Sequence, residues 1–198
     1  MTDQDSETKL SDVLDTIHLW EDAFEKSEEF ARLSQAQQRE ARGITETFAQ
    51  HSYEHLGESP EQWTPRSVRK ICTEILPRKV SAEPAFFETI APVLSEFFNF
   101  LERQGIFAKA QALARTAASS HQELVANSQD QSTWEPAKHF IMSARDAGVD
   151  FRNPEALDAF IETFNRQFWS CFRVADPASS SWRVIPSSEL LNGKTAVG

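Results

Sequence analysis

Apolar residues recur at intervals of three and four along most of this chain, which is the spacing of one face of an α-helix. The first apolar stripe predicts a helix that begins at Ser11, a good N-cap residue, after an acidic tip. A second helix is expected to begin at Ser34, which can form a capping box with Gln37, and to end at Gly57. The first stripe consists of Leu10, Val13, Leu14, Ile17, Trp20 and Phe24.

Later helices are marked by capping residues that stand just before a proline or three residues before an acid. These start signals are Thr64-Pro65, Ser132 with Glu135, and Asn153-Pro154. Pro77 is expected to end the first of these helices, because proline removes a backbone hydrogen bond. A single helix is expected over residues 107–125, after Gly105 closes the one before it.

The most apolar segment lies in the middle of the chain, between Phe86 and Leu101. It leaves only a narrow polar face, and a helix that is apolar nearly all round must be surrounded by other helices. We therefore expect it to be the central helix of the fold. Pro92 is expected either to kink this helix or to split it in two.

No segment shows the alternation of apolar and polar residues that is typical of a strand. The chain is therefore expected to be all-α, a compact multi-helix bundle of about six or seven helices. Three parts are predicted: an acidic N-terminal arm with a helix over residues 1–33, a helical bundle domain over residues 34–173, and an irregular C-terminal tail over residues 174–198.

The net charge of −10 is concentrated at the amino terminus, where the first 30 residues hold ten acids and two lysines. Such an acidic balance argues against general binding to nucleic acid, because that binding needs a cationic face. No 18 apolar residues run together, so no membrane span is expected. The absence of a secretory signal, together with two cysteines expected to be reduced thiols (Cys72 and Cys171), predicts a cytoplasmic protein.

The pentapeptide HSYEH is the sharpest candidate for chemistry. Four positions apart on a helix, His51 and His55 project from one face as zinc ligands require, and Glu54 could activate a bound water. These five residues match H-x-x-E-H and so resemble the motif of the inverted zinc peptidases. The resemblance, which ends with the pentapeptide, implies a zinc-dependent hydrolase with a distant glutamate ligand, for which Glu123 and Glu135 are the candidates.

A structural interpretation of the same histidines stands beside the catalytic one. His51 and His55 continue the apolar stripe of Ala41, Ile44 and Phe48, so they can be hydrogen-bonded side chains at the edge of the core. In that case no cofactor is expected.

A short basic stretch over residues 66–79 is the exception to the acidic balance. Arg66, Arg69 and Lys70 lie near one another on a helix, where they could bind an anion or a phosphate backbone. The alternatives are a solvated face or an intramolecular dock for the acidic first helix, and the net negative charge favours these.

The tail carries an apolar cluster, Trp182, Val184 and Ile185, in otherwise irregular sequence. Such a segment can bind a protein partner or fold back on its own domain, and the sequence leaves both open. The favoured function is that of a non-catalytic intracellular protein-interaction or regulatory protein. A zinc-dependent hydrolase at residues 51–55 is the first alternative, and anion or nucleic-acid binding at residues 66–79 is the second. The sequence leaves the oligomeric state open.

Overall fold

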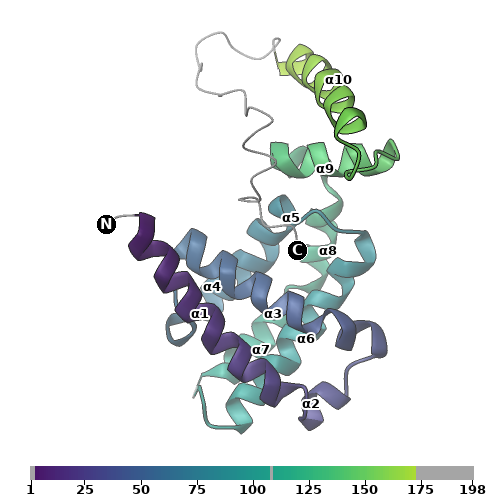
Figure 1. Cartoon of the computed structure of the whole chain (residues 1–198). Coiled ribbons are helices and arrows are strands. Elements are labelled where there is room, and N and C mark those ends of the chain that lie inside the picture. The colour runs from purple at the N-terminus through teal and green to yellow at the C-terminus, as the bar shows by residue number, and fades with distance from the viewer. Residues whose placement is uncertain (1–2, 108, 173–198) are drawn as a thin grey trace. The chain divides into compact units, whose positions relative to one another are not determined.

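The computed structural model describes residues 3–107 and 109–172, and the side chains of residues 9–107 and 109–166 (Figure 1). These residues form helices joined by short turns and contain no strand, which confirms the predicted all-α multi-helix class. None of the described helices combines the length and the apolar character that a membrane crossing requires. The α-helices are α1 (Asp3–Phe24), α2 (Glu28–Ala31), α3 (Gln35–Leu56), α4 (Pro65–Lys70), α5 (Leu76–Lys79), α6 (Pro84–Arg103), α7 (Ala110–Ser119), α8 (His121–Gln129), α9 (Pro136–Asp146) and α10 (Pro154–Phe172). Short 3-10 turns are η1 (Pro60–Gln62) and η3 (Gln131–Thr133), and η2 (Ile71–Ile75) is a π-helix.

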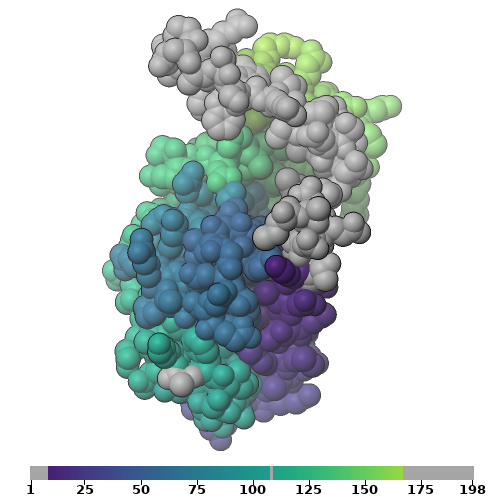
Figure 2. Space-filling view, turned by 90° about the vertical axis from the view of Figure 1, so that its left-hand side faces the viewer, coloured from purple at the N-terminus to yellow at the C-terminus, as the bar shows by residue number. Residues whose placement is uncertain are grey.

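The chain divides into two compact units, Met1–Glu135 and Pro136–Gly198. In the first unit α1 lies against α3, as Figures 1 and 2 both show, and it also contacts α6. The two helices of the acidic segment over residues 1–33 contact the rest of this unit, α1 through α3 and α2 through α6. The tail over residues 174–198 lies outside the described residues.

The core of the first unit is built around α6, which packs against α7, α3, α8 and α2. The prediction that this segment is the central helix is confirmed, because side chains such as Phe87 and Phe97 are at most 1% exposed. Phe98 of the same helix meets Phe48 and Trp63 edge to face, with ring centroids 5.7 and 5.9 Å apart. These aromatic contacts fix α3 and the segment before α4 on the central helix.

Several predicted helix ends are confirmed, because they depend on neighbours in the sequence. The Ser34 hydroxyl accepts from the Gln37 backbone N–H at 3.3 Å, and the Gln37 side chain accepts from the Ser34 N–H at 2.8 Å. Gly57 ends α3 at φ 68°, a backbone conformation that suits glycine. Thr64 caps α4 by accepting from the backbone N–H of Ser67 at 3.1 Å.

Other predicted boundaries are wrong. α1 begins at Asp3, so Ser11 lies in its interior: acidic residues favour the first turn of a helix, and the acidic tip continues the helix. The helix expected over residues 107–125 is instead two helices, α7 and α8, which meet at Ser120. The Ser120 hydroxyl donates to the Thr116 carbonyl at 2.8 Å, a side-chain bond that competes with regular helix geometry. Pro92 does not split α6, which runs unbroken from Pro84 to Arg103.

The capping box expected between Ser132 and Glu135 does not form. Ser132 lies in η3 and its hydroxyl donates to Asp130 at 2.7 Å. The Glu135 side chain instead accepts from Lys79 Nζ at 2.8 Å. An acid held by a distant lysine cannot reach back to its own helix start, and α9 begins at Pro136.

The sequence predicted that Pro77 would end its helix. Instead, Pro77 lies in α5, directly after the π-helix η2. In a regular α-helix the N–H of residue 77 would donate to the carbonyl of Thr73, and proline has no N–H. The side chain of Asn127, on α8, donates to that carbonyl at 2.7 Å instead. A polar group from a neighbouring helix thus satisfies the backbone acceptor that proline leaves, and the chain stays helical through the wider π turn.

The second unit contains α9 and α10, whose phenylalanines pack on one another. The Phe140 ring lies 5.5 Å from that of Phe160 and 5.2 Å from that of Phe164, measured between centroids. The predicted Gly148 ending of α9 is confirmed by its φ of 69°. Asn153 caps α10 as predicted, because its side-chain oxygen accepts from the two backbone N–H groups of Glu155 and Ala156.

Candidate functional site

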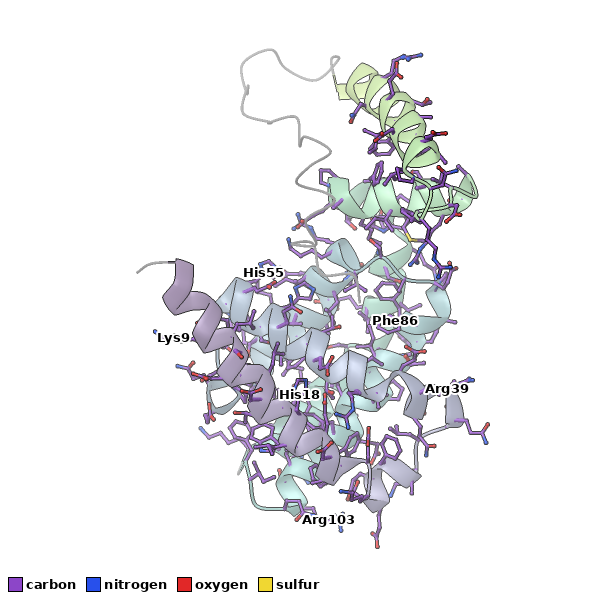
Figure 3. All side chains as sticks on the ribbon, viewed as in Figure 1. Lys9, His18, Arg39, His55, Phe86 and Arg103 are labelled. Carbon is purple, nitrogen blue, oxygen red and sulfur yellow. The ribbon has the colours of Figure 1, made fainter. Side chains whose placement is uncertain are left out.

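The last two turns of α3 bring His51, Glu54 and His55 together on one helix face. One nitrogen of each histidine and one carboxylate oxygen all lie within 4.8 Å of one another. The two imidazole rings stack, with centroids 5.3 Å apart and planes 15° from parallel, because positions four apart lie one above the other. Figure 3 labels His55 at this end of α3 and His18 on α1.

Burial favours the neutral form of both imidazoles. It lowers the pKa of His51 to about 4, against a smaller opposing effect of the Glu54 carboxylate. The pKa of His55 is also lowered, by burial first and by the positive charge of Lys79 second. Neutral imidazole is the form that binds a metal ion, so no proton has to leave before either histidine can coordinate.

One polar atom of His51 makes no hydrogen bond to the described residues. Its Nδ1 is buried and has no hydrogen-bond partner among the described residues. The nearest ionic group is Glu54 Oε2 at 3.7 Å, which is too far for a hydrogen bond. Glu54 is held in place by Gln50, whose amide donates to the other carboxylate oxygen at 2.8 Å. A buried acceptor without a donor is costly, and a bound cation would satisfy it.

A pocket of about 280 Å³ adjoins His55. The π-helix η2 and the short helix α5 supply one side of it, so the wide turn at Pro77 shapes its wall. Its charged groups have both signs, which means that it favours neither simple anions nor simple cations. The lining residues are His55, Lys70, Glu74, Ile75, Arg78, Lys79 and Glu135.

The structure separates the two glutamates considered as distant ligands. Glu135 lies in the pocket beside His55, held there by its backbone N–H, which donates to the Arg78 carbonyl at 3.0 Å, and by its ion pair with Lys79. Glu123 instead pairs with Arg69 at 2.5 Å. Of the two candidates, Glu135 is the one that shares a site with the histidines.

Of the basic stretch, Lys70, Arg78 and Lys79 line the pocket beside His55, together with the acids Glu74 and Glu135. Arg69 is paired with Glu123, and Lys79 is paired with Glu135. Arg66 is exposed on α4, whereas Lys70 lines the pocket beside His55. The acids of α1 that form ion pairs with arginine do so with Arg42 of α3, so the described residues show no docking of the first helix on the basic stretch.

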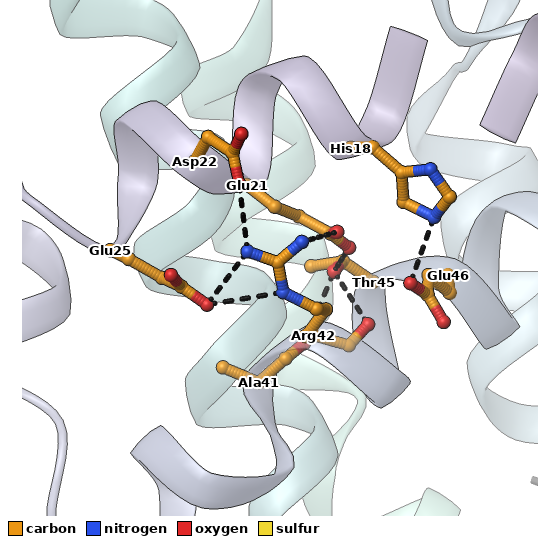
Figure 4. Close-up of polar contacts among 8 residues, drawn as sticks. All are labelled: His18, Glu21, Asp22, Glu25, Ala41, Arg42, Thr45 and Glu46. Carbon is orange, nitrogen blue, oxygen red and sulfur yellow. Dashed lines mark hydrogen bonds and ion pairs between the residues drawn. The ribbon is translucent and has the colours of Figure 1, made fainter. Parts of the chain in front are cut away.

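The structure contains a second polar cluster that was not predicted from the sequence. It joins α1 to α3 around the buried carboxyl of Glu21, which accepts a hydrogen bond from Thr45 (Figure 4). A signal was present, because Glu21 stands four residues after Ile17 and three before Phe24, on the apolar stripe itself. An acid on a buried face needs a partner from another helix, and only the fold supplies one.

The proposed partner-binding residues Trp182, Val184 and Ile185 lie outside the described residues, as does the Cys171 side chain. Cys72 is buried, as predicted for a thiol that acts as a small apolar side chain. Comparison of the chain with protein-family models, with curated proteins and with solved structures found no match.

Proposed function

We propose that this protein is a non-catalytic helical interaction protein that binds a zinc-class metal ion at the end of α3. The observation that supports the metal site is the convergence of ligand atoms from His51, Glu54 and His55 within 4.8 Å. Two imidazole nitrogens and one carboxylate oxygen form a donor set that zinc accepts, and they leave a fourth position for water or a further ligand.

The surrounding charges set the strength of this binding. The ammonium group of Lys79 lies close enough to lower the pKa of both histidines, so it also opposes a cation at the same place. We therefore expect weaker binding than at a structural zinc site with four protein ligands. Because the pKa values of both imidazoles lie below the ordinary 6.5, the affinity should change little between pH 6.5 and 8.

Isothermal titration of chelator-treated protein with zinc chloride tests the site. We expect one bound ion per chain, and a loss of affinity of more than about tenfold in each of His51→Ala and His55→Ala. His121→Ala is the matched control. This histidine lies outside the site, and its Nε2 pairs with Glu88 Oε2 at a distance of 3.1 Å. Equal zinc affinity in all four proteins would show that the convergence of these side chains has no role in binding.

A hydrolase at the same residues is the second candidate, and Glu54 separates the two. A carboxylate that coordinates the metal cannot also serve as the base that activates its water. If Glu54 is a metal ligand, the substitution Glu54→Gln should lower the zinc affinity. If Glu54 is the base, the same substitution should leave the zinc affinity unchanged and abolish zinc-dependent hydrolysis of a chromogenic ester or peptide.

The interaction role is supported by the second unit. Along α10 the apolar side chains at helical spacing are only half-buried, and Phe151 just before this helix is 43% exposed. A twofold dimer uses the same patch on both chains, so a second copy of the chain can cover this row, and that is the partner we propose for it. The row consists of Leu157, Phe160, Ile161 and Phe164.

Sedimentation velocity over a range of concentrations tests this association. We expect a dimer that dissociates in Ile161→Ser, whereas Glu162→Ser on the exposed side of α10 should remain dimeric. The tail is the competing occupant, through Trp182, Val184 and Ile185. A monomer that becomes a dimer only when residues 174–198 are deleted would assign the row to the tail, and a monomer in both forms would refute self-association.

A further inference from the structure

One carboxyl group is buried in the contact between α1 and α3. Glu21 is 1% exposed, and its Oε1 accepts from the Thr45 hydroxyl of α3. Its Oε2 is also buried and has no hydrogen-bond partner among the described residues. The nearest cation, Arg42 Nη1, is 3.5 Å from Oε2, which is longer than a hydrogen bond (Figure 4). A charge on this carboxyl is therefore poorly compensated.

The hydrogen bonds around Thr45 suit a protonated Glu21. The hydroxyl has one proton but three oxygens within reach: Glu21 Oε1, the Ala41 carbonyl at 3.1 Å and the Arg42 carbonyl at 3.0 Å. A neutral Glu21 can donate its own proton to the Thr45 oxygen, which then donates to a helix carbonyl. An ionised Glu21 has no proton to give, so it competes with those carbonyls for the single proton of Thr45.

The electrostatic balance agrees with this geometry. Burial, with a smaller contribution from the neighbouring carboxylate of Glu46, raises the pKa of Glu21 to about 7. Thr45, Arg42 and His18 act in the opposite direction.

Arg42 cannot neutralise Glu21 fully, because it is shared with two exposed acids of α1. Its Nη2 lies 2.9 Å from Asp22 and 3.0 Å from Glu25. α6 and α2 also contact α1 and meet it with aromatic rings. Between centroids, Phe24 lies 5.3 and 5.5 Å from Phe97 and Phe100 of α6, and 5.4 Å from Phe30 of α2. The charged or titratable groups that face Glu21 are thus Arg42 and Glu46 of α3 and His18, Asp22 and Glu25 of α1.

We propose that Glu21 is a proton-operated latch that holds α1 on α3, and that loss of this proton loosens α1. When α1 moves away, the aromatic surface that Phe24 covers on α6 becomes accessible, so the latch would control exposure of an apolar face in the first unit. The latch depends on neither the metal site nor the α10 row.

The sign and size of the effect follow from the two protonation equilibria. A released Glu21 has the ordinary pKa of 4.5, and the docked one has a pKa of about 7. Docking is therefore most favourable below pH 4.5, weakens as the pH rises from 4.5 to 7, and is weakest above 7. A difference of this size corresponds to a change of roughly 300-fold in the docking equilibrium.

Hydrogen exchange of α1, corrected for the intrinsic pH dependence of exchange, measures this docking. In the wild-type chain we expect protection of residues 12–24 to fall by roughly two orders of magnitude between pH 5 and pH 8.5. Glu21→Gln places a neutral amide at this position. In this variant the protection of residues 12–24 should differ by less than about threefold between these pH values. His18→Gln is the matched control for the other titratable pair, His18 with Glu46 at 2.9 Å, and should retain the wild-type fall.

A second measurement needs no variant. In wild-type protein labelled at the glutamate carboxyl carbons, one carboxyl resonance should titrate with a midpoint near pH 7. Titration of every glutamate below pH 5.5, or a pH-dependent fall in protection that persists in Glu21→Gln, would overturn the proposal.

Discussion

Replacing Asn127 with alanine removes the side chain that donates to the Thr73 carbonyl, 2.7 Å away, where Pro77 has no N–H to offer. Thr73 is 3% exposed, so water cannot easily replace the lost donor. A buried carbonyl left without a partner costs about 1–3 kcal/mol. We expect the free energy of unfolding of Asn127→Ala to fall by about 2 kcal/mol, measured by urea denaturation with tryptophan fluorescence.

A double-mutant cycle tests the assigned cause. Pro77→Ala restores a backbone N–H that can reach the Thr73 carbonyl in regular helix geometry. Asn127→Ala should therefore cost about 1 kcal/mol less when Pro77→Ala is already present. Gln122→Ala, on the exposed face of the same helix α8, measures the change in helix propensity alone. The reasoning fails if the two substitutions are additive, or if Asn127→Ala is no more destabilising than Gln122→Ala.

Three further substitutions and modifications test the core, a helix end and a thiol. Phe98→Ala should lower the free energy of unfolding by about 3–5 kcal/mol, because this ring is fully buried against Phe48 and Trp63; a loss below 1 kcal/mol in urea denaturation would contradict that packing. Ser34→Ala should cost about 1 kcal/mol in the same assay, whereas no change would mean that the capping box of α3 contributes nothing. Because burial raises the pKa of Cys72 to about 12, alkylation of this thiol at pH 8 should require unfolding; mass spectrometry showing rapid modification of the folded protein would be the opposite result.

The sequence was informative where local signals decide the structure. The capping residues Ser34, Thr64 and Asn153 act on backbone groups two or three positions away, so the chain itself contains both partners. The apolar segment in α6 is similarly self-evident, since a helix with almost no polar face has to be surrounded.

Features that depend on a partner from another helix could not be predicted. Where the helix continues past Pro77, the carbonyl that proline leaves accepts from Asn127, fifty residues later. In the candidate metal site the spacing of His51 and His55 predicted that they share one helix face, but the position of Glu135 beside His55 depends on Lys79 and on the Arg78 carbonyl. The burial of Glu21 likewise follows from the packing of α1 on α3.

X-ray absorption at the zinc edge of the zinc-loaded protein tests the proposed metal centre most directly. A site formed by His51, Glu54 and His55 predicts two imidazole nitrogens among about four light-atom ligands. The imidazole scattering should disappear in the double variant His51→Ala/His55→Ala. A spectrum with sulfur ligands, or with oxygen ligands and no imidazole, would contradict the assignment.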